Sequence, residues 1–143
     1  MQKSYRILVL EDSEALAPGM LRALTEKALE KNIPVEIVHV TSVNEAKQAL
    51  KDPTFTCASF DMVCPRYPNE VSSFQTDGGA QVARYNERHR NIPYLVYSSN
   101  EVDHLEMLLK AHGVTKFPIT LKKTSYLGYP SWAEAVLNLI PKE

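Results

Sequence analysis

Short apolar runs alternate with segments of helical periodicity along almost the whole chain, and no other feature restricts the possible folds as strongly. The runs are rich in Ile, Val and Leu, which is typical of buried strands, and they cover residues 6–10, 35–40, 55–60, 94–97 and 114–121. The segments with helical spacing cover residues 17–32, 43–50, 79–88, 101–112 and 132–140. Because parallel strands need crossover connections of this length, the alternation predicts an α/β fold with a five-stranded parallel sheet and helices on both faces.

Capping and turn residues indicate where several of these elements begin and end. Ser42 to Glu45 and Ser131 to Glu134 have the Ser-x-x-Glu spacing of a capping box, which predicts a helix start at each place. Gly113 is the expected C-terminal residue of the fourth helix, since glycine readily adopts the positive φ of a helix end. Pro118 has no amide hydrogen, so the last strand is expected at an edge of the sheet or at a bulge.

The length and composition are those of one globular domain. At 143 residues the chain can bury a core unaided, and we expect a single domain over residues 1–143. The net charge of -1 argues against nucleic acid or an anionic membrane as the main partner, because both require a basic face. No apolar run approaches the roughly 20 residues that span a bilayer, and residues 1–6 lack a signal-peptide pattern. The expected location is therefore the cytoplasm, where Cys57 and Cys64 should be reduced thiols.

Residues that carry chemistry close the expected strands. They are three carboxylates, one hydroxyl and a pair of lysines, namely Glu11, Asp12, Asp61, Ser98, Lys122 and Lys123. Open α/β sheets bind their ligands at the carboxyl ends of the strands, so these side chains are expected to converge on one site.

A cluster of three carboxylates favours a hard cation and a phosphoryl group. Carboxylates placed together repel one another unless protons or a cation neutralise them. Mg²⁺ suits such a cluster because it usually takes one or two carboxylates, keeps several waters and completes its shell with phosphate oxygens. A lysine would add a second positive charge and a hydroxyl could donate to a phosphoryl oxygen, which together stabilise charge that develops in transfer. Asp61 is the expected nucleophile.

Three segments resemble those of response-regulator receiver domains of the CheY-like superfamily. The opening Ile7-Leu8-Val9-Leu10-Glu11-Asp12-Ser13 is similar to their acidic-pair segment. Asp61-Met62-Val63-Cys64-Pro65 resembles their phosphoacceptor segment, with a proline four residues after the aspartate. Pro93-Tyr94-Leu95-Val96-Tyr97-Ser98-Ser99 is similar to their fourth strand, and the order and spacing agree along nearly the whole chain.

The resemblance implies a flavodoxin-like, doubly wound fold with strand order 2-1-3-4-5. It also implies that Glu11 and Asp12 hold Mg²⁺ directly or through water, with Asp61 and the Val63 carbonyl as further ligands. Asp61 would accept the phosphoryl group and Ser98 would be the switch hydroxyl. The implied donor is a sensor histidine kinase or a histidine phosphotransfer protein. Because the chain ends soon after the last helix, we expect a stand-alone receiver, a switch more than an enzyme, that signals by contact with a downstream protein.

Two segments depart from the receiver pattern. Receivers usually end the fifth strand with Lys-Pro, whereas this chain has Lys122-Lys123-Thr124. Spacing from Gly113 does not settle which residue takes the lysine role; Lys122 is preferred and Lys123 is the alternate. The interpretation without a functional role is a solvated pair of basic residues. The loop over residues 66–78 is longer than usual and could cover the site or present a partner surface.

Other interpretations stay open. A pseudo-receiver would use the same fold as a phosphorylation-independent interaction module. An aspartyl phosphohydrolase would need a second acid two residues after its nucleophile, where Val63 stands. An FMN-binding domain would need a loop rich in hydroxyls and glycine after the first strand, which residues 13–18 do not form.

The remaining conspicuous side chains are expected to be structural. The four histidines lack ligand spacing, so no zinc site is predicted. Tyr97, next to Ser98, is more simply a core residue than a signalling side chain, and Trp132 is expected to anchor the last helix.

Overall fold

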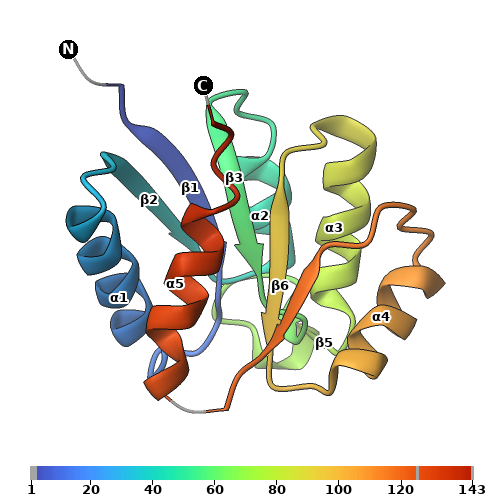
Figure 1. The fold of residues 1–143 in the computed structure, drawn as a ribbon. Coiled ribbons are helices and arrows are strands. Elements are labelled where there is room, and N and C mark those ends of the chain that lie inside the picture. Colours follow the sequence, from blue (N-terminus) through green and yellow to red (C-terminus); the bar gives the residue numbers. More distant parts are fainter. Residues whose placement is uncertain (1–2, 125, 143) are drawn as a thin grey trace.

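A five-stranded parallel sheet forms the centre of the molecule. The computed structural model describes residues 3–124 and 126–142. The strands lie in the order β2-β1-β3-β6-β7, with β1 at Tyr5–Leu10, β2 at Val35–Val40, β3 at Phe55–Phe60, β6 at Tyr94–Ser98 and β7 at Ile119–Lys122 (Figure 1). In chain order along this sheet, that is 2-1-3-4-5, so the predicted fold class and topology are confirmed.

Helices cover both faces of the sheet (Figure 1). The helices α1, at Ala17–Glu30, and α5, at Tyr129–Leu137, pack on one face. The other face carries α2, at Val43–Ala49, α3, at Gly78–His89, and α4, at Val102–Ala111. Successive side chains of a strand point to opposite faces, and so Ile7 and Val9 of β1 lie under α1 and α5 while Leu8 and Leu10 lie under α2 and α3. Such a strand is buried on both sides, which is why it is apolar without alternation.

The last helix is fixed through Trp132. Its indole is fully buried, its Nε1 donates a hydrogen bond to the Ser59 hydroxyl at 2.9 Å, and its ring stacks on Tyr97 with 5.6 Å between centroids. Tyr97 is itself buried. Both aromatic rings are therefore part of the core, in agreement with the sequence-based expectation.

One of the two predicted serine caps forms and the other does not. Ser42 is the N-cap of α2, where its hydroxyl accepts a hydrogen bond from the Glu45 amide at 3.2 Å. The prediction for Ser131 is wrong, because α5 already begins at Tyr129 and has proline in its first turn, where a missing N–H has no cost. Gly113 follows α4 with φ of +79°, as predicted.

The segments between the predicted helices and strands contain structure that the sequence did not predict. The stretch that was expected to be a loop over residues 66–78 contains the 3-10 helix η1 at Val71–Ser73 and the strand β5 at Phe74–Gln75. β5 pairs with β4, at Cys64–Pro65 just before the stretch, in a short antiparallel hairpin. The last strand begins only after Pro118, and the turn η2 at Tyr126–Gly128 leads into α5. Among the described residues, no helix is both long and apolar enough to cross a membrane.

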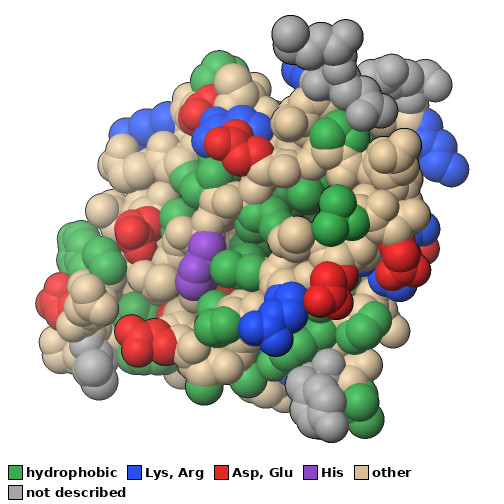
Figure 2. Space-filling model, turned by 90° about the vertical axis from the view of Figure 1, so that its left-hand side faces the viewer, with side chains coloured by type: hydrophobic (Ala, Val, Ile, Leu, Met, Phe, Trp, Pro, Cys, Tyr) green, Lys and Arg blue, Asp and Glu red, His purple; other side chains and the backbone are tan. Residues whose placement is uncertain are grey.

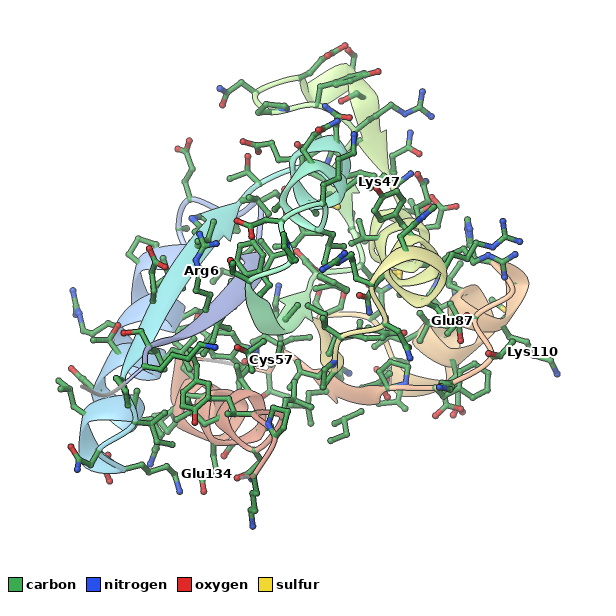
Figure 3. All side chains as sticks on the ribbon, turned by 90° about the horizontal axis from the view of Figure 1, so that it is seen from above. Arg6, Lys47, Cys57, Glu87, Lys110 and Glu134 are labelled. Atoms are coloured by element: carbon green, nitrogen blue, oxygen red, sulfur yellow. The ribbon has the colours of Figure 1, made fainter. Side chains whose placement is uncertain are left out.

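Charged side chains are dispersed over the surface in view. On the face shown in Figure 2, acidic and basic groups are interspersed with apolar ones and form no patch of a single sign. Seen along the sheet, Cys57 lies at the centre of the molecule while Lys110 and Glu134 project from its rim (Figure 3). This distribution agrees with the net charge of -1.

Candidate functional site

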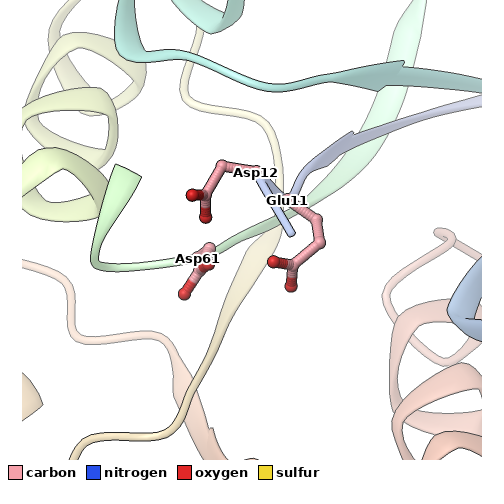
Figure 4. Close-up of side chains that lie close together, drawn as sticks. All are labelled: Glu11, Asp12 and Asp61. Atoms are coloured by element: carbon pink, nitrogen blue, oxygen red, sulfur yellow. The ribbon is translucent and has the colours of Figure 1, made fainter. Parts of the chain in front are cut away.

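Three carboxylates meet at the carboxyl ends of β1 and β3 (Figure 4). Glu11 and Asp12 directly follow β1, and Asp61 directly follows β3. The two strands are paired in register through Leu10 and Phe60, which places the residues after them side by side. One oxygen from each carboxylate lies within 4.8 Å of the others, so the predicted convergence of the three acids is found in the structure.

The backbone around Asp61 is held on both sides. Its amide donates to the Leu10 carbonyl at 3.0 Å, which continues the β1–β3 pairing by one residue. On the other side the Gly79 amide donates to the Met62 carbonyl at 2.9 Å. A Cβ at residue 79 would lie 2.4 Å from the Asp61 carbonyl oxygen, so only glycine allows the start of α3 to approach this closely.

The cluster is buried enough to oppose its own ionisation. Glu11 is 1% exposed and Asp61 is 6% exposed. Burial, together with repulsion from Glu11, raises the pKa of Asp61 to about 8. Burial also raises the pKa of Asp12, with a further contribution from Glu11. A cation among these oxygens would oppose both effects, because it favours the charged form of each carboxylate.

Lys123 supplies the positive charge on one side of the cluster. Its Nζ pairs with Glu11 Oε1, lies 3.3 Å from Asp61 Oδ2 and stands 5.5 Å from the centre of the Tyr97 ring. Burial alone lowers the pKa of Lys123, but attraction to Asp61 and Glu11 outweighs it and leaves the pKa above its ordinary value. Lys123 is therefore a charged partner of the acids.

The sequence-based preference for Lys122 is corrected by this geometry. Lys122 is paired in register with Ser98, and its side chain turns outward, 40% exposed, to an ion pair with Glu101. Lys123 follows the strand, and its amide donates to the Ser98 carbonyl at 2.8 Å. Neighbouring residues at a strand end point in opposite directions, so only one of the two lysines can reach the acids.

Ser98 closes β6, where its hydroxyl is held by a neighbouring side chain. Its hydroxyl is buried and donates to Asn100 Oδ1 at 3.0 Å. The next residue, Ser99, lines the cavity that contains the acids, as does Val63, whose carbonyl was the expected additional ligand. Sequence reasoning did not single out Ser99, although the Ser-Ser pair was visible.

A cavity of about 350 Å³ opens above the acids. Much of its wall is apolar. Its lining residues are Glu11, Asp12, Ser13, Leu16, Asp61, Val63, Phe74, Ser99, Lys123, Thr124 and Tyr129. Sequence reasoning missed Phe74 and Tyr129, because both come from segments whose position depends on tertiary packing and gives no periodic signal.

The histidine and the two cysteines near the site have structural roles. His39 Nε2 lies 2.7 Å from the Glu11 carbonyl, to which a ring N–H donates, and so supports the backbone of the site. Cys57 and Cys64 are buried free thiols, and burial raises the pKa of Cys57 to about 12. A thiol with such a pKa is not nucleophilic near neutral pH, which favours the interpretation of these residues as inert core groups.

Comparisons with known proteins bear on the fold. No family model matches the sequence, and no curated protein is similar enough to count as a relative. Solved structures do match over nearly the whole chain. The phosphorylated cyanobacterial phytochrome response regulator RcpA has a TM-score of 0.67 and 17% identity, with 97% of this chain and 98% of that chain covered. The chain has the receiver-domain fold.

Two further receiver-fold structures show the same likeness. The CheY-like receiver domain protein from Methanospirillum hungatei has a TM-score of 0.61 and 14% identity, covering 95% of each chain. The receiver domain of the sensor histidine kinase PA1611 from Pseudomonas aeruginosa has a TM-score of 0.63 and 14% identity, covering 95% of this chain and 99% of that one. That structure has a magnesium ion coordinated in its active site cleft. At these identities the likeness establishes the receiver-domain fold, and the chemistry has to be argued from the residues of this site.

Proposed function

We propose that this protein is a response regulator whose Asp61 accepts a phosphoryl group from a histidine kinase or a histidine phosphotransfer protein. One observation carries the proposal. The Asp61 carboxylate lines a cavity, with the Lys123 ammonium 3.3 Å away and with oxygens of Glu11 and Asp12 within 4.8 Å. This arrangement suits a nucleophile that needs both a bound cation and a fixed positive charge beside it.

The donor set fits Mg²⁺. The acids offer oxygen ligands only, within 4.8 Å of one another. Within the described residues, one cation, Lys123, pairs with them, so a fully ionised cluster keeps an excess of negative charge. Glu11, Asp12 and Asp61 would hold the ion, with the Val63 carbonyl as a further ligand. When bound, Mg²⁺ would supply positive charge for the phosphoryl oxygens.

The remaining roles fall to groups of the chain itself. A carboxylate oxygen of Asp61 forms the new bond to phosphorus while the bond between phosphorus and the donor breaks. Lys123 stabilises the negative charge on the phosphoryl group, and its ion pair with Glu11 keeps it at the mouth of the site. Ser98 is the switch hydroxyl, which exchanges its present acceptor, Asn100, for a phosphoryl oxygen. The message then leaves by contact with a downstream protein, in the cytoplasm and with no nucleic acid involved.

The pseudo-receiver alternative loses its main support. It rested on the missing Lys-Pro dipeptide and on the long loop after Asp61. The structure brings Lys123 to the acids without a following proline, so the positive charge of the expected constellation is present.

Intact-mass measurement tests the proposal. The protein is incubated with acetyl phosphate and Mg²⁺, and we expect a gain of one phosphoryl group that chelation of Mg²⁺ prevents. Asp61→Asn should abolish the gain, whereas Asp103→Asn, at an exposed position in the first turn of α4, should leave it unchanged. Labelling of Asp61→Asn at the wild-type rate would disprove the assignment.

A further inference from the structure

The β4–β5 hairpin is held firmly beside the mouth of the site. The Arg66 amide donates to the Ser73 carbonyl at 2.9 Å, which closes the hairpin. The Asn44 amide donates to the Arg66 carbonyl at 2.9 Å, which ties the hairpin to α2. The Gln81 amide group donates to Gln75 Oε1 at 2.7 Å, which ties it to α3. A side chain on this hairpin therefore has a defined position relative to Asp61.

Phe74 is the aromatic residue that this hairpin places in the wall of the cavity. It is 47% exposed, and it lines both the cavity that contains Asp61 and a smaller neighbour of about 160 Å³. A single exposed apolar side chain is ordinary. Phe74 is unusual because it lines the same cavity as the acids, together with the apolar residues Leu16, Val63 and Tyr129.

The cavity is larger than the reaction at Asp61 requires. At about 350 Å³ it falls in the range of roughly 300–1,000 Å³ that is typical of sites for whole small molecules. The acids and Lys123 would hold a phosphoryl group and a cation. The apolar part of the lining is then left for the group that carries the phosphoryl into the site. A flat ring with both apolar and polar edges suits a space with an aromatic wall and a charged floor.

We propose that Phe74 is a specificity-determining residue that favours phosphodonors whose leaving group is an imidazole ring. The proposal rests on the function proposed above, since it concerns the donor for the same aspartate. The donor ring contacts the Phe74 side chain, which directs the phosphoryl group toward Asp61. Donors without a ring react by the same chemistry but gain nothing from Phe74.

The transfer step is the same for all such donors. An Asp61 carboxylate oxygen forms a bond to phosphorus while the phosphorus–nitrogen bond of the donor breaks. The electron pair of that bond stays on the leaving nitrogen, which takes a proton from solvent and departs as neutral imidazole. No oxidant, reductant or further reactant is needed, and Phe74 takes no part in bond making.

Two donors with the same type of bond isolate the effect of the ring. Monophosphoimidazole and phosphoramidate both carry phosphorus on nitrogen, but only the first has a ring. Labelling rates of the full chain with Mg²⁺ are measured for both by intact mass. Aromatic contacts are worth enough to change a rate about 2- to 10-fold, so Phe74→Ala should slow labelling by monophosphoimidazole by that factor and leave phosphoramidate unchanged.

Three variants sharpen the test. Phe74→Tyr should keep the preference for the ring-bearing donor, and Phe74→Leu should lose most of it while keeping an apolar wall. Tyr67→Ala is the matched control, because Tyr67 is a similarly exposed aromatic near the same hairpin that lines a different cavity. Equal slowing of both donors in Phe74→Ala, or an unchanged ratio of their rates, would overturn the role of Phe74 and leave the proposed function standing. Absence of labelling of Asp61 by either donor in the wild type would overturn the proposed function as well.

Discussion

Replacing Asp61 by asparagine should stabilise the metal-free protein at neutral pH. Burial, followed by repulsion from Glu11, raises the pKa of Asp61 from 3.8 to about 8. Between these two pH values the unfolded chain has lost the proton and the folded protein has kept it, so stability falls as pH rises through this window. At about 1.4 kcal/mol per pKa unit, the penalty is on the order of 4 kcal/mol at pH 7.

Thermal unfolding in the presence of a chelator measures this penalty. For a chain of this size 1 kcal/mol shifts Tm by roughly 3 °C, so between pH 5 and pH 7.5 the wild-type Tm should fall by roughly 5–10 °C relative to that of Asp61→Asn. Asp103→Asn, at an exposed position, should follow the wild type. Mg²⁺ should reduce the difference, because a cation bound by Glu11, Asp12 and Asp61 stabilises the ionised form. Parallel Tm curves for wild type and Asp61→Asn in chelator would refute the reasoning.

Three further outcomes follow from the contacts described above. Lys123→Met should slow labelling by acetyl phosphate at least about 10-fold, because it removes the ammonium 3.3 Å from Asp61. Lys122→Met disrupts only an exposed pair with Glu101 and should label at the wild-type rate, so equal effects of the two variants would refute the assignment of the lysine role to Lys123. Asp12→Ala should weaken Mg²⁺ binding in titrations followed by Trp132 fluorescence, while Glu14→Ala, at an exposed position, should leave it unchanged. Unchanged affinity in Asp12→Ala would exclude Asp12 as a ligand. Ser42→Ala should lower the free energy of unfolding in urea by about 1 kcal/mol through loss of the α2 cap, while Ser131→Ala, inside α5, should cost far less.

The alternation of strands and helices and the position of three acids could be predicted from local pattern, whereas the strand order was implied by the resemblance to receiver domains. Buried parallel strands are apolar throughout, so their ends are marked by the first charged residue, as at Glu11 and Asp61. The order of the strands then brings those ends together without any further information.

The lysine and the cavity wall could not be predicted in this way. Pro118 delays the last strand, which begins at Ile119, and the spacing from Gly113 therefore gave no register for Lys122 and Lys123. Only pairing of β7 with β6 decides which lysine faces the acids. Phe74 lies in a segment without periodicity, and its place at the site depends on hydrogen bonds to α2 and α3 that no local pattern reveals.

The same contacts explain why this site could act as a switch. In the absence of a cation, burial and repulsion from Glu11 oppose ionisation of Asp61, so the folded protein keeps a proton there at neutral pH and loses stability by doing so. Binding of a cation or addition of a phosphoryl group changes the charge where Lys123 and the end of β6 meet, because the Lys123 amide donates to the Ser98 carbonyl. Through Lys123, Asp61 is linked to the β6–β7 edge, and the neighbouring Lys122 pairs with Glu101 at the start of α4. We expect a change of charge at Asp61 to be transmitted to α4 along these contacts.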